Sequence, residues 1–119
     1  RFGSCVLDEH HLVAATRYVL MNPVRAGMVN APCEYTWSSA RYHAGLNEDD
    51  PLVKDRTLKG LITCWQEFIS VEDDEKARHL HRVTLTGRPA GNDDFIQRIK
   101  RLTGRDLRIG MPGRPRKQL

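Results

Sequence analysis

The dipeptide Asn22-Pro23 constrains the fold more than any other feature, because it interrupts the strongest helical periodicity of the chain. The residue before a proline is pushed out of the α region, so a helix that runs up to Met21 must end there. Pro23 itself suits the first turn of a new short helix, and Gly27 suits the position just after the end of that helix. The chain is therefore expected to turn between two helices at this point.

The helix before this break is predicted over residues 9–21. Its apolar residues recur at the three- to four-residue spacing of a helix face: Leu12, Ala15 and Val19. Asp8 suits the N-cap position, and Glu9 places an acid in the first turn, where the helix dipole favours it. The apolar stretch that precedes the helix, residues 2–7, is predicted to form a short strand.

The remaining sequence divides into further short helices and turns. Helices are expected over four stretches: Thr36 or Trp37 to Tyr42 with Gly45 as the stop, residues 57–71, residues 72–83, and residues 93–103. The last has Asn92 as its N-cap, Ile99 in an apolar stripe with Phe95 and Leu102, and Gly104 as its stop. Residues 46–56 are predicted to form an acidic loop and residues 86–91 a turn.

The chain is expected to be one small, soluble, mainly α-helical domain with a tail. A length of 119 residues suits a modest core, and no stretch approaches the ~20 apolar residues that a membrane span needs. The cysteines are odd in number and widely spaced (Cys5, Cys33 and Cys64), which favours reduced thiols and a cytoplasmic location. The opening Arg1-Phe2-Gly3-Ser4 reads as mid-chain sequence, so we expect an N-terminal part to precede it.

Positive charge is concentrated at the C-terminal end, although the net charge of the whole chain is only +4. Residues 96–119 hold eight basic residues and one acid, Asp106, so they carry +7 and the other 95 residues sum to −3. A mildly acidic body with a basic end is typical of a protein that contacts nucleic acid. The alternative is a solvated tail that keeps the protein soluble.

Tyr18 and Asn22 are the residues with the clearest chemical potential. They are separated by one helical turn, so they lie on one stripe of the predicted helix together with His11 and Ala14. A phenol beside a polar oxygen can act as a nucleophile next to a metal ligand, once a cation or a base activates it. The alternative is a tyrosine that packs its ring on the core and an asparagine that caps the helix.

Two strings of sequence resemble a known family. Y-V-L-M-N-P-V-R-A-G-M-V, followed by P-C-E-Y-T-W-S-S-A-R-Y, is similar to the signature of the HUH single-tyrosine transposases, in their repeat-associated branch. The later string T-G-R-P-A-G-N-D-D-F-I-Q-R-I-K-R-L-T-G-R, with G-R-P-R-K after it, is similar to the C-terminal extension of such proteins. The resemblance touches most of the chain except residues 46–82.

The resemblance implies a reaction and a domain plan. Tyr18 would attack a phosphodiester of single-stranded DNA, form a 5′-phosphotyrosine link and free a 3′-hydroxyl. Residues 1–45 would be the nucleophile helix and Asn-Pro-Val-Arg-Ala-Gly region of a transposase domain whose catalytic sheet mostly lies elsewhere. Residues 46–109 would be a helical C-terminal extension and residues 110–119 a basic arm, with too few apolar residues to be ordered unless bound.

The same resemblance implies a divalent metal, Mg²⁺ or Mn²⁺, in the complete enzyme and none in this part of it. A His-hydrophobic-His pair on a strand and a polar residue one turn after the tyrosine would hold the ion. Asn22 takes that polar position, where insertion-sequence relatives carry glutamine, so it either binds the metal or caps the helix. Upstream of Tyr18 no such histidine pair occurs, because His10 and His11 are adjacent.

One literal match to the histidine pattern lies downstream, at His79-Leu80-His81. On a strand, residues i and i+2 share a face and both side chains could reach one ion. On a helix they lie about 200° apart and could not. The surrounding sequence has a helical pattern, so the family's pair is expected in the N-terminal part that we infer.

DNA, single-stranded or hairpin, is the expected partner, and a homodimer is an open possibility. The residues expected to contact phosphates are Arg17, Arg25, Arg98, Arg101, Arg105, Arg114, Arg116 and Lys117. The run that begins at Gly113 resembles an AT-hook core, which binds the narrow minor groove of A·T tracts. The aromatic residues of the middle segment could stack on unpaired bases or pack in the core: Tyr35, Trp37 and Tyr42.

The sequence therefore predicts part of a transposase that cleaves and rejoins single-stranded DNA, with Tyr18 as nucleophile, and predicts that this part alone is inactive. A non-enzymatic DNA-binding module with the same helices is the alternative. A helical protein-interaction domain is a third hypothesis, but it leaves the basic end without a purpose.

Overall fold

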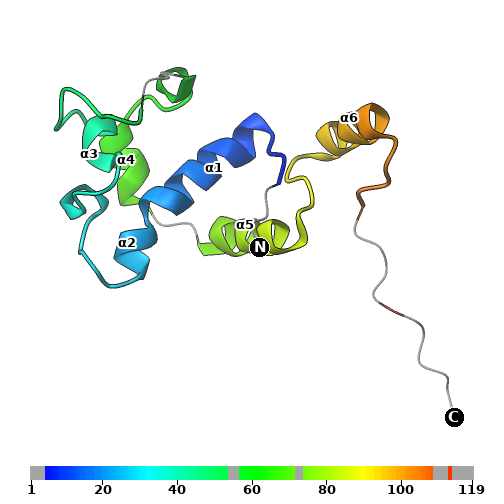
Figure 1. Ribbon diagram of the computed structural model, residues 1–119, viewed down its shortest axis with the longest axis horizontal. Helices are drawn as coiled ribbons and strands as arrows, with labels where there is room; N and C mark the ends of the chain where they lie inside the picture. Colours follow the sequence, from blue (N-terminus) through cyan, green and yellow to red (C-terminus); the bar gives the residue numbers. More distant parts are fainter. Residues whose placement is uncertain (1–4, 54–56, 72–73, 109–112, 114–119) are drawn as a thin grey trace, which may run out of the picture.

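The computed structural model describes residues 5–53, 57–71, 74–108 and 113, and these ranges are mainly helical (Figure 1). The elements are α1 (Glu9–Leu20), α2 (Asn22–Arg25), η1 (Pro32–Glu34), α3 (Ala40–His43), η2 (Thr57–Gly60), α4 (Trp65–Ser70), α5 (Asp74–Thr86) and α6 (Asp93–Thr103). Within those ranges the chain forms no strand, only an isolated parallel bridge between Leu7 and Ala90. The predicted mainly helical fold is confirmed.

The chain turns between two helices at Asn22-Pro23, as expected, but Asn22 is itself the first residue of α2 and does not leave the helical conformation. The Asp8 carboxylate accepts a hydrogen bond from the His11 backbone N–H at 2.8 Å, which caps α1 at its start. Met21 caps the end of α1 and at the same time leads into α2, which has Pro23 in its first turn. Gly27 follows with a φ of +68°, a backbone conformation that favours glycine.

The core lies where one end of α1 meets α3 and α4. Its buried residues come from four separate segments: Leu20, Ala40, Ile62, Phe68 and Ile69. α1 runs through the middle of the molecule, with α3 and α4 at one end and α5 alongside it (Figure 1). α4 and α5 therefore pack on different sides of α1, and these two helices determine which side chains of α1 are covered.

Asp8 also links the start of α1 to the segment just before α6. Its second carboxylate oxygen accepts a hydrogen bond from the Asn92 backbone N–H at 3.0 Å, next to the Leu7–Ala90 bridge. Partial burial raises the pKa of Asp8, but hydrogen bonds from His11 and from the Asn92 backbone lower that pKa more, so it lies below its usual value. The predicted strand over residues 2–7 is reduced to this bridge in the described residues; residues 2–4 lie outside them.

Two predicted helices are wrong in extent. The helix expected from Thr36 or Trp37 begins only at Ala40, because the Ser38 hydroxyl accepts a hydrogen bond from the Ala40 backbone N–H at 3.0 Å and closes a turn first. The helix expected over residues 57–71 is divided into η2 and α4. Gly60 weakens it, and Cys64 adopts an extended conformation at the start of α4.

The other predicted helices agree with the structure within the described ranges. α5 runs to Thr86, three residues beyond the expected end, and residues 72–73 lie outside the described part. α6 has its Asn92 cap, whose side chain accepts from the Phe95 backbone N–H at 2.9 Å, and Gly104 follows with a φ of +67°. Apart from Gly113, the expected arm over residues 110–119 lies outside the described residues.

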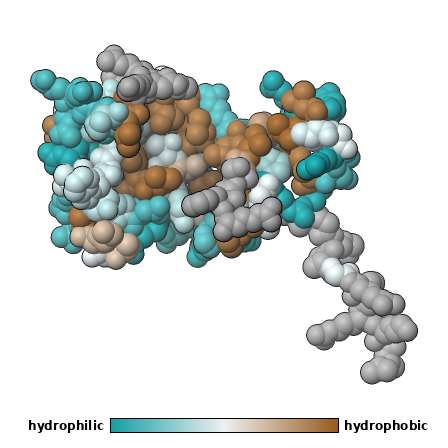
Figure 2. Space-filling view, in the orientation of Figure 1, coloured by the Kyte–Doolittle hydropathy of each residue, from teal (hydrophilic) through white to brown (hydrophobic). Residues whose placement is uncertain are grey.

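The predicted apolar stripe of α1 is only partly buried, with Ala15 half-buried. Leu12 is 37% exposed and Val19 61%, because α4 packs beside Val13 and Arg17 instead. Figure 2 shows apolar side chains gathered over the middle of the molecule, around α1. The stripe of α6 is likewise only partly covered, with Leu102 73% exposed.

The described residues contain neither a disulfide nor a membrane-spanning helix. The three cysteines are unpaired, and Cys64 is exposed. None of the described helices is long and apolar enough to cross a membrane.

Candidate functional site

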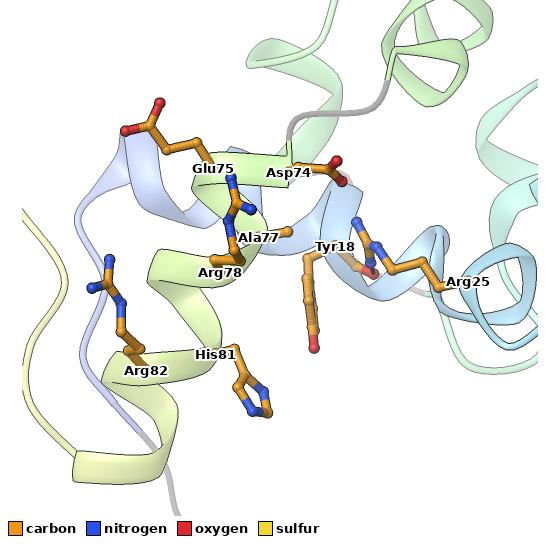
Figure 3. A pocket seen from close by; sticks show the side chains of 8 residues that line it. All are labelled: Tyr18, Arg25, Asp74, Glu75, Ala77, Arg78, His81 and Arg82. Carbon is orange, nitrogen blue, oxygen red and sulfur yellow. Dashed lines mark hydrogen bonds between the residues drawn. The ribbon is translucent and has the colours of Figure 1, made fainter.

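Tyr18 lies in an open groove of about 650 Å³ between α1 and α5 (Figure 3). α1 supplies Tyr18, and Arg25 comes from the end of α2. The rest of the lining comes from α5: Asp74, Glu75, Ala77, Arg78, His81 and Arg82. The groove therefore joins the predicted nucleophile to a helix more than 50 positions later in the chain.

The local sequence of α5 explains why these side chains share a groove. Asp74, Arg78 and Arg82 are spaced by four residues each, so they follow one stripe of the helix, and His81 lies beside Arg78 on the same side. From the sequence, His81 was considered only as part of a histidine pair, and Arg78 and Arg82 were missed as site residues. The four-residue spacing of the two arginines was a visible signal, but nothing in it identified α1 as the neighbour.

Arg25 is held against Tyr18. Its guanidinium carbon lies 4.6 Å from the centre of the Tyr18 ring, a cation–π arrangement. The Arg25 Nη1 donates to the Tyr18 backbone carbonyl at 2.9 Å and to the Asn22 Oδ1 at 3.5 Å. The short helix α2 folds Arg25 back over α1, so the break at Pro23 is what brings a cation to the tyrosine.

The groove is polarised along its length. Three arginines and two carboxylates stand among the described side chains that line it, which gives a formal charge of +1 with His81 neutral. Figure 3 shows Asp74 and Glu75 at one end and the hydroxyl end of Tyr18 at the other, where the His81 ring also projects. In the same view the Arg78 guanidinium also lies toward the acidic end, so the phenol end lies away from both the acids and that arginine.

No known family, curated protein or solved structure matches this chain. Any function of the groove is therefore inferred from the side chains that line it.

Among the arginines expected to contact phosphates, Arg17 has an inward position. Its Nε donates to the Phe68 backbone carbonyl at 2.8 Å, and its guanidinium carbon lies 4.2 Å from the centre of the Phe68 ring. Arg17 thus links α1 to α4, and we infer that its role is to stabilise the fold. Arg25 lines the groove with Tyr18.

The remaining expected phosphate contacts lie far along the chain from Tyr18. Arg98, Arg101 and Arg105 are exposed on or just after α6, which Figure 1 shows apart from the other helices. Arg114, Arg116 and Lys117 lie outside the described residues. Of the described residues expected to contact phosphates, Arg25 thus lies in the groove, and Arg98, Arg101 and Arg105 lie on or just after α6.

The side chains around Tyr18 do not complete the metal site that the resemblance implies. Asn22 is exposed, and its Oδ1 accepts from Arg25. With the side chains as they lie, no three His, Cys, Asp or Glu residues of the described ranges are grouped as ligands of one metal ion. His79 and His81 both lie on α5, and they line different cavities, as expected for residues two apart on a helix.

Among the aromatic residues proposed for base stacking, Trp37 is 87% exposed, so it does not pack in the core. Tyr35 and Tyr42 are half-buried. The core aromatic residue that packs with Phe68 is instead Trp65, whose ring lies stacked on His43 at 4.2 Å between centres.

Proposed function

We propose that this chain is part of a DNA-processing protein of the single-tyrosine transposase type, and that the groove at Tyr18 binds a phosphodiester of single-stranded DNA. One observation carries the proposal: Tyr18 shares its groove with Arg25, Arg78 and Arg82. Arginine is well suited to phosphate, because its planar guanidinium offers two parallel N–H donors to two oxygens.

The reaction proposed at the groove is a transesterification. The Tyr18 oxygen attacks phosphorus, a bond forms between them, and the bond from phosphorus to the 3′ oxygen breaks. The phenol proton is removed, a proton reaches the departing 3′ oxygen, and the 5′ phosphate stays on Tyr18. The reverse reaction rejoins DNA without any other source of energy.

Individual side chains of the groove have separate roles in this proposal. Arg78 and Arg82 neutralise the phosphate from α5, while Arg25 lies over the tyrosine ring and stabilises negative charge that develops on the phenol oxygen. The His81 imidazole projects at the same end as the phenol and can take up or return its proton. No step is assigned to a metal ion, because the described residues do not complete a site for one.

The groove can be tested through its phosphate contacts. Arg78→Ala and Arg82→Ala should each weaken binding of a short fluorescent single-stranded oligonucleotide, and each should flatten the slope of log K against log salt by about 0.7. Arg108→Ala is the control, because it removes the same charge from an exposed position that does not line the groove. Anisotropy titrations at several salt concentrations measure both quantities. Equal losses in all three variants would assign the effect to general charge and not to the groove.

A non-enzymatic DNA-binding module is the second candidate. The exposed cations of α6 favour it, since Arg98, Arg101 and Arg105 could contact phosphates without Tyr18. This alternative predicts that α6 substitutions weaken binding while Arg78→Ala and Arg82→Ala leave it unchanged. The same titrations therefore separate the two hypotheses.

A further inference from the structure

A second cavity, of about 590 Å³, also lies between α1 and α5. Histidines from both helices line it: His10 and His11 from α1 and His79 from α5, together with Glu75. Two cationic side chains of α5, Lys76 and Arg82, line it as well. The proposed reaction at Tyr18 uses none of these three histidines.

The two histidines of His79-Leu80-His81 are thus divided between two sites. Residues i and i+2 project about 200° apart on a helix, so His81 faces Tyr18 while His79 faces His11. The ring centres of His11 and His79 lie 5.6 Å apart, with the ring planes tilted by 52°. The partner of His79 is a histidine 68 positions earlier and not its neighbour in sequence.

His11 is oriented by a carboxylate. Its Nδ1 lies 2.6 Å from the Asp8 Oδ1, and because an ionised carboxylate only accepts, the ring donates its Nδ1 proton. The other nitrogen, Nε2, then carries the lone pair. A carboxylate that holds one imidazole nitrogen while the other binds a metal is the usual outer arrangement of histidine ligands.

The separation of the two rings fits a shared ion. With metal–nitrogen bonds of about 2.0–2.1 Å, two imidazoles on one zinc ion at a roughly tetrahedral angle have ring centres about 5–6 Å apart. Glu75 lies one helical turn before His79, and the His10 ring centre lies 5.9 Å from that of His11. Either side chain could supply a third ligand after a rotamer change, and water would complete the set.

We propose that His11 and His79 form a binding site for a divalent ion that prefers imidazole, such as Zn²⁺, Ni²⁺ or Co²⁺, and that the ion links α1 to α5. The nitrogen ligands favour these ions over Mg²⁺, which prefers oxygen. His11 and His79 do not line the phosphodiester groove, although Glu75 and Arg82 line both cavities, and the proposed site does not depend on the function proposed for Tyr18. It would fix α5, and with it Arg78 and His81, against the tyrosine helix.

The experiment uses the purified 119-residue chain, freed of metal and titrated with ZnCl₂, with MgCl₂ as the control ion. Thermal unfolding followed by circular dichroism should show a Zn²⁺-dependent rise of Tm that MgCl₂ does not produce, since an ion that binds only the folded state stabilises it. His11→Gln and His79→Gln should each lower the Zn²⁺ association constant at least tenfold. His81→Gln, on the same helix but in the other groove, should change it less than twofold.

Asp8→Asn is the sharper variant, because asparagine remains a good N-cap and preserves α1. It removes the carboxylate behind His11 and should weaken Zn²⁺ binding by about 10- to 100-fold. In the unaltered chain, ring ¹⁵N spectra should show the His11 and His79 nitrogens shifting together at one equivalent of Zn²⁺. If no Zn²⁺ binds, or if the shifting rings exclude His11 or His79, or if His81→Gln weakens binding as much as His79→Gln, the proposed site is overturned.

Discussion

Tyr18 and Arg17 are neighbours in sequence with opposite environments. The Tyr18 ring faces the groove beneath the Arg25 guanidinium, whereas the Arg17 guanidinium lies on the Phe68 ring beside α4. Adjacent helical residues project about 100° apart, so α5 meets one side chain and α4 the other. The two residues should therefore respond differently to substitution, one in chemistry and the other in stability.

Tyr18→Phe should remove the proposed chemistry and preserve the groove. In a protein that joins this chain to a His-hydrophobic-His strand, the variant should form no covalent DNA adduct, because only the attacking oxygen is lost. The ring stays under Arg25, so affinity for single-stranded DNA should remain within a few-fold. Denaturing gels detect the adduct and anisotropy measures the affinity. Normal cleavage by the variant would exclude Tyr18 as the nucleophile.

Arg17→Ala should destabilise the fold. It removes a hydrogen bond to the Phe68 carbonyl and the guanidinium stacked on that ring, which together contribute about 1–3 kcal/mol. Urea unfolding followed by circular dichroism measures the loss. Arg98→Ala removes the same charge from an exposed position and should change the free energy of unfolding by less than about 0.5 kcal/mol. Similar values for the two variants would contradict the role assigned to Arg17.

At the scale of elements, the N-cap of α1 is also a link to α6. The Asp8 carboxylate accepts from the His11 backbone at the start of α1 and from the Asn92 backbone just before α6. Since the Leu7–Ala90 bridge lies beside it, a capping residue here stabilises more than one helix. Sequence reasoning identified the cap and had no signal for the second contact.

Asp8→Ala should therefore cost more than an ordinary N-cap. Loss of the cap alone destabilises by about 1 kcal/mol, and loss of the hydrogen bond to Asn92 adds about 0.5–1.5 kcal/mol. Asp8→Asn keeps an oxygen acceptor for the cap and should lose less than half as much. Both variants are measured by urea unfolding without added metal. Equal losses would mean that an amide oxygen cannot replace the carboxylate, and a loss no larger than about 1 kcal/mol in Asp8→Ala would contradict a role for the second contact.

At the scale of the whole molecule, the cations form separate groups: the groove at Tyr18, the exposed face of α6, and the sequence after residue 110. Phosphate contacts position DNA without specifying its sequence. Binding should therefore show little sequence preference and a strong dependence on salt.

Deleting residues 110–119 should show how much the cations after residue 110 contribute to DNA binding. It removes Arg114, Arg116 and Lys117, so the slope of log K against log salt on duplex DNA should flatten by roughly two to three units. If the Gly113 run occupies a minor groove, Arg114→Ala should cost more on A·T-rich than on G·C-rich duplexes. Anisotropy titrations of both chains on both duplexes test this. An unchanged slope after deletion would leave the tail with a solubilising role only.

The sequence by itself determined the local features of this protein. Asp8 and Asn92 cap helices, Pro23 lies in the first turn of one, and Gly27 and Gly104 follow helix ends with positive φ, all as expected. Each of these features depends on residues within about four positions of one another. Capping and backbone preferences therefore specify them before any tertiary contact forms.

Only the tertiary structure decided which faces are covered and which side chains meet. The stripe of Leu12 and Val19 predicted a helix correctly, but α4 and α5 pack on other sides of α1 and leave that stripe only partly buried. Tyr18 meets Arg78 and His81 from a helix more than 50 positions away. Periodicity within a segment shows which residues share a face, but it does not show which segment covers that face, because the choice depends on how all the helices pack together.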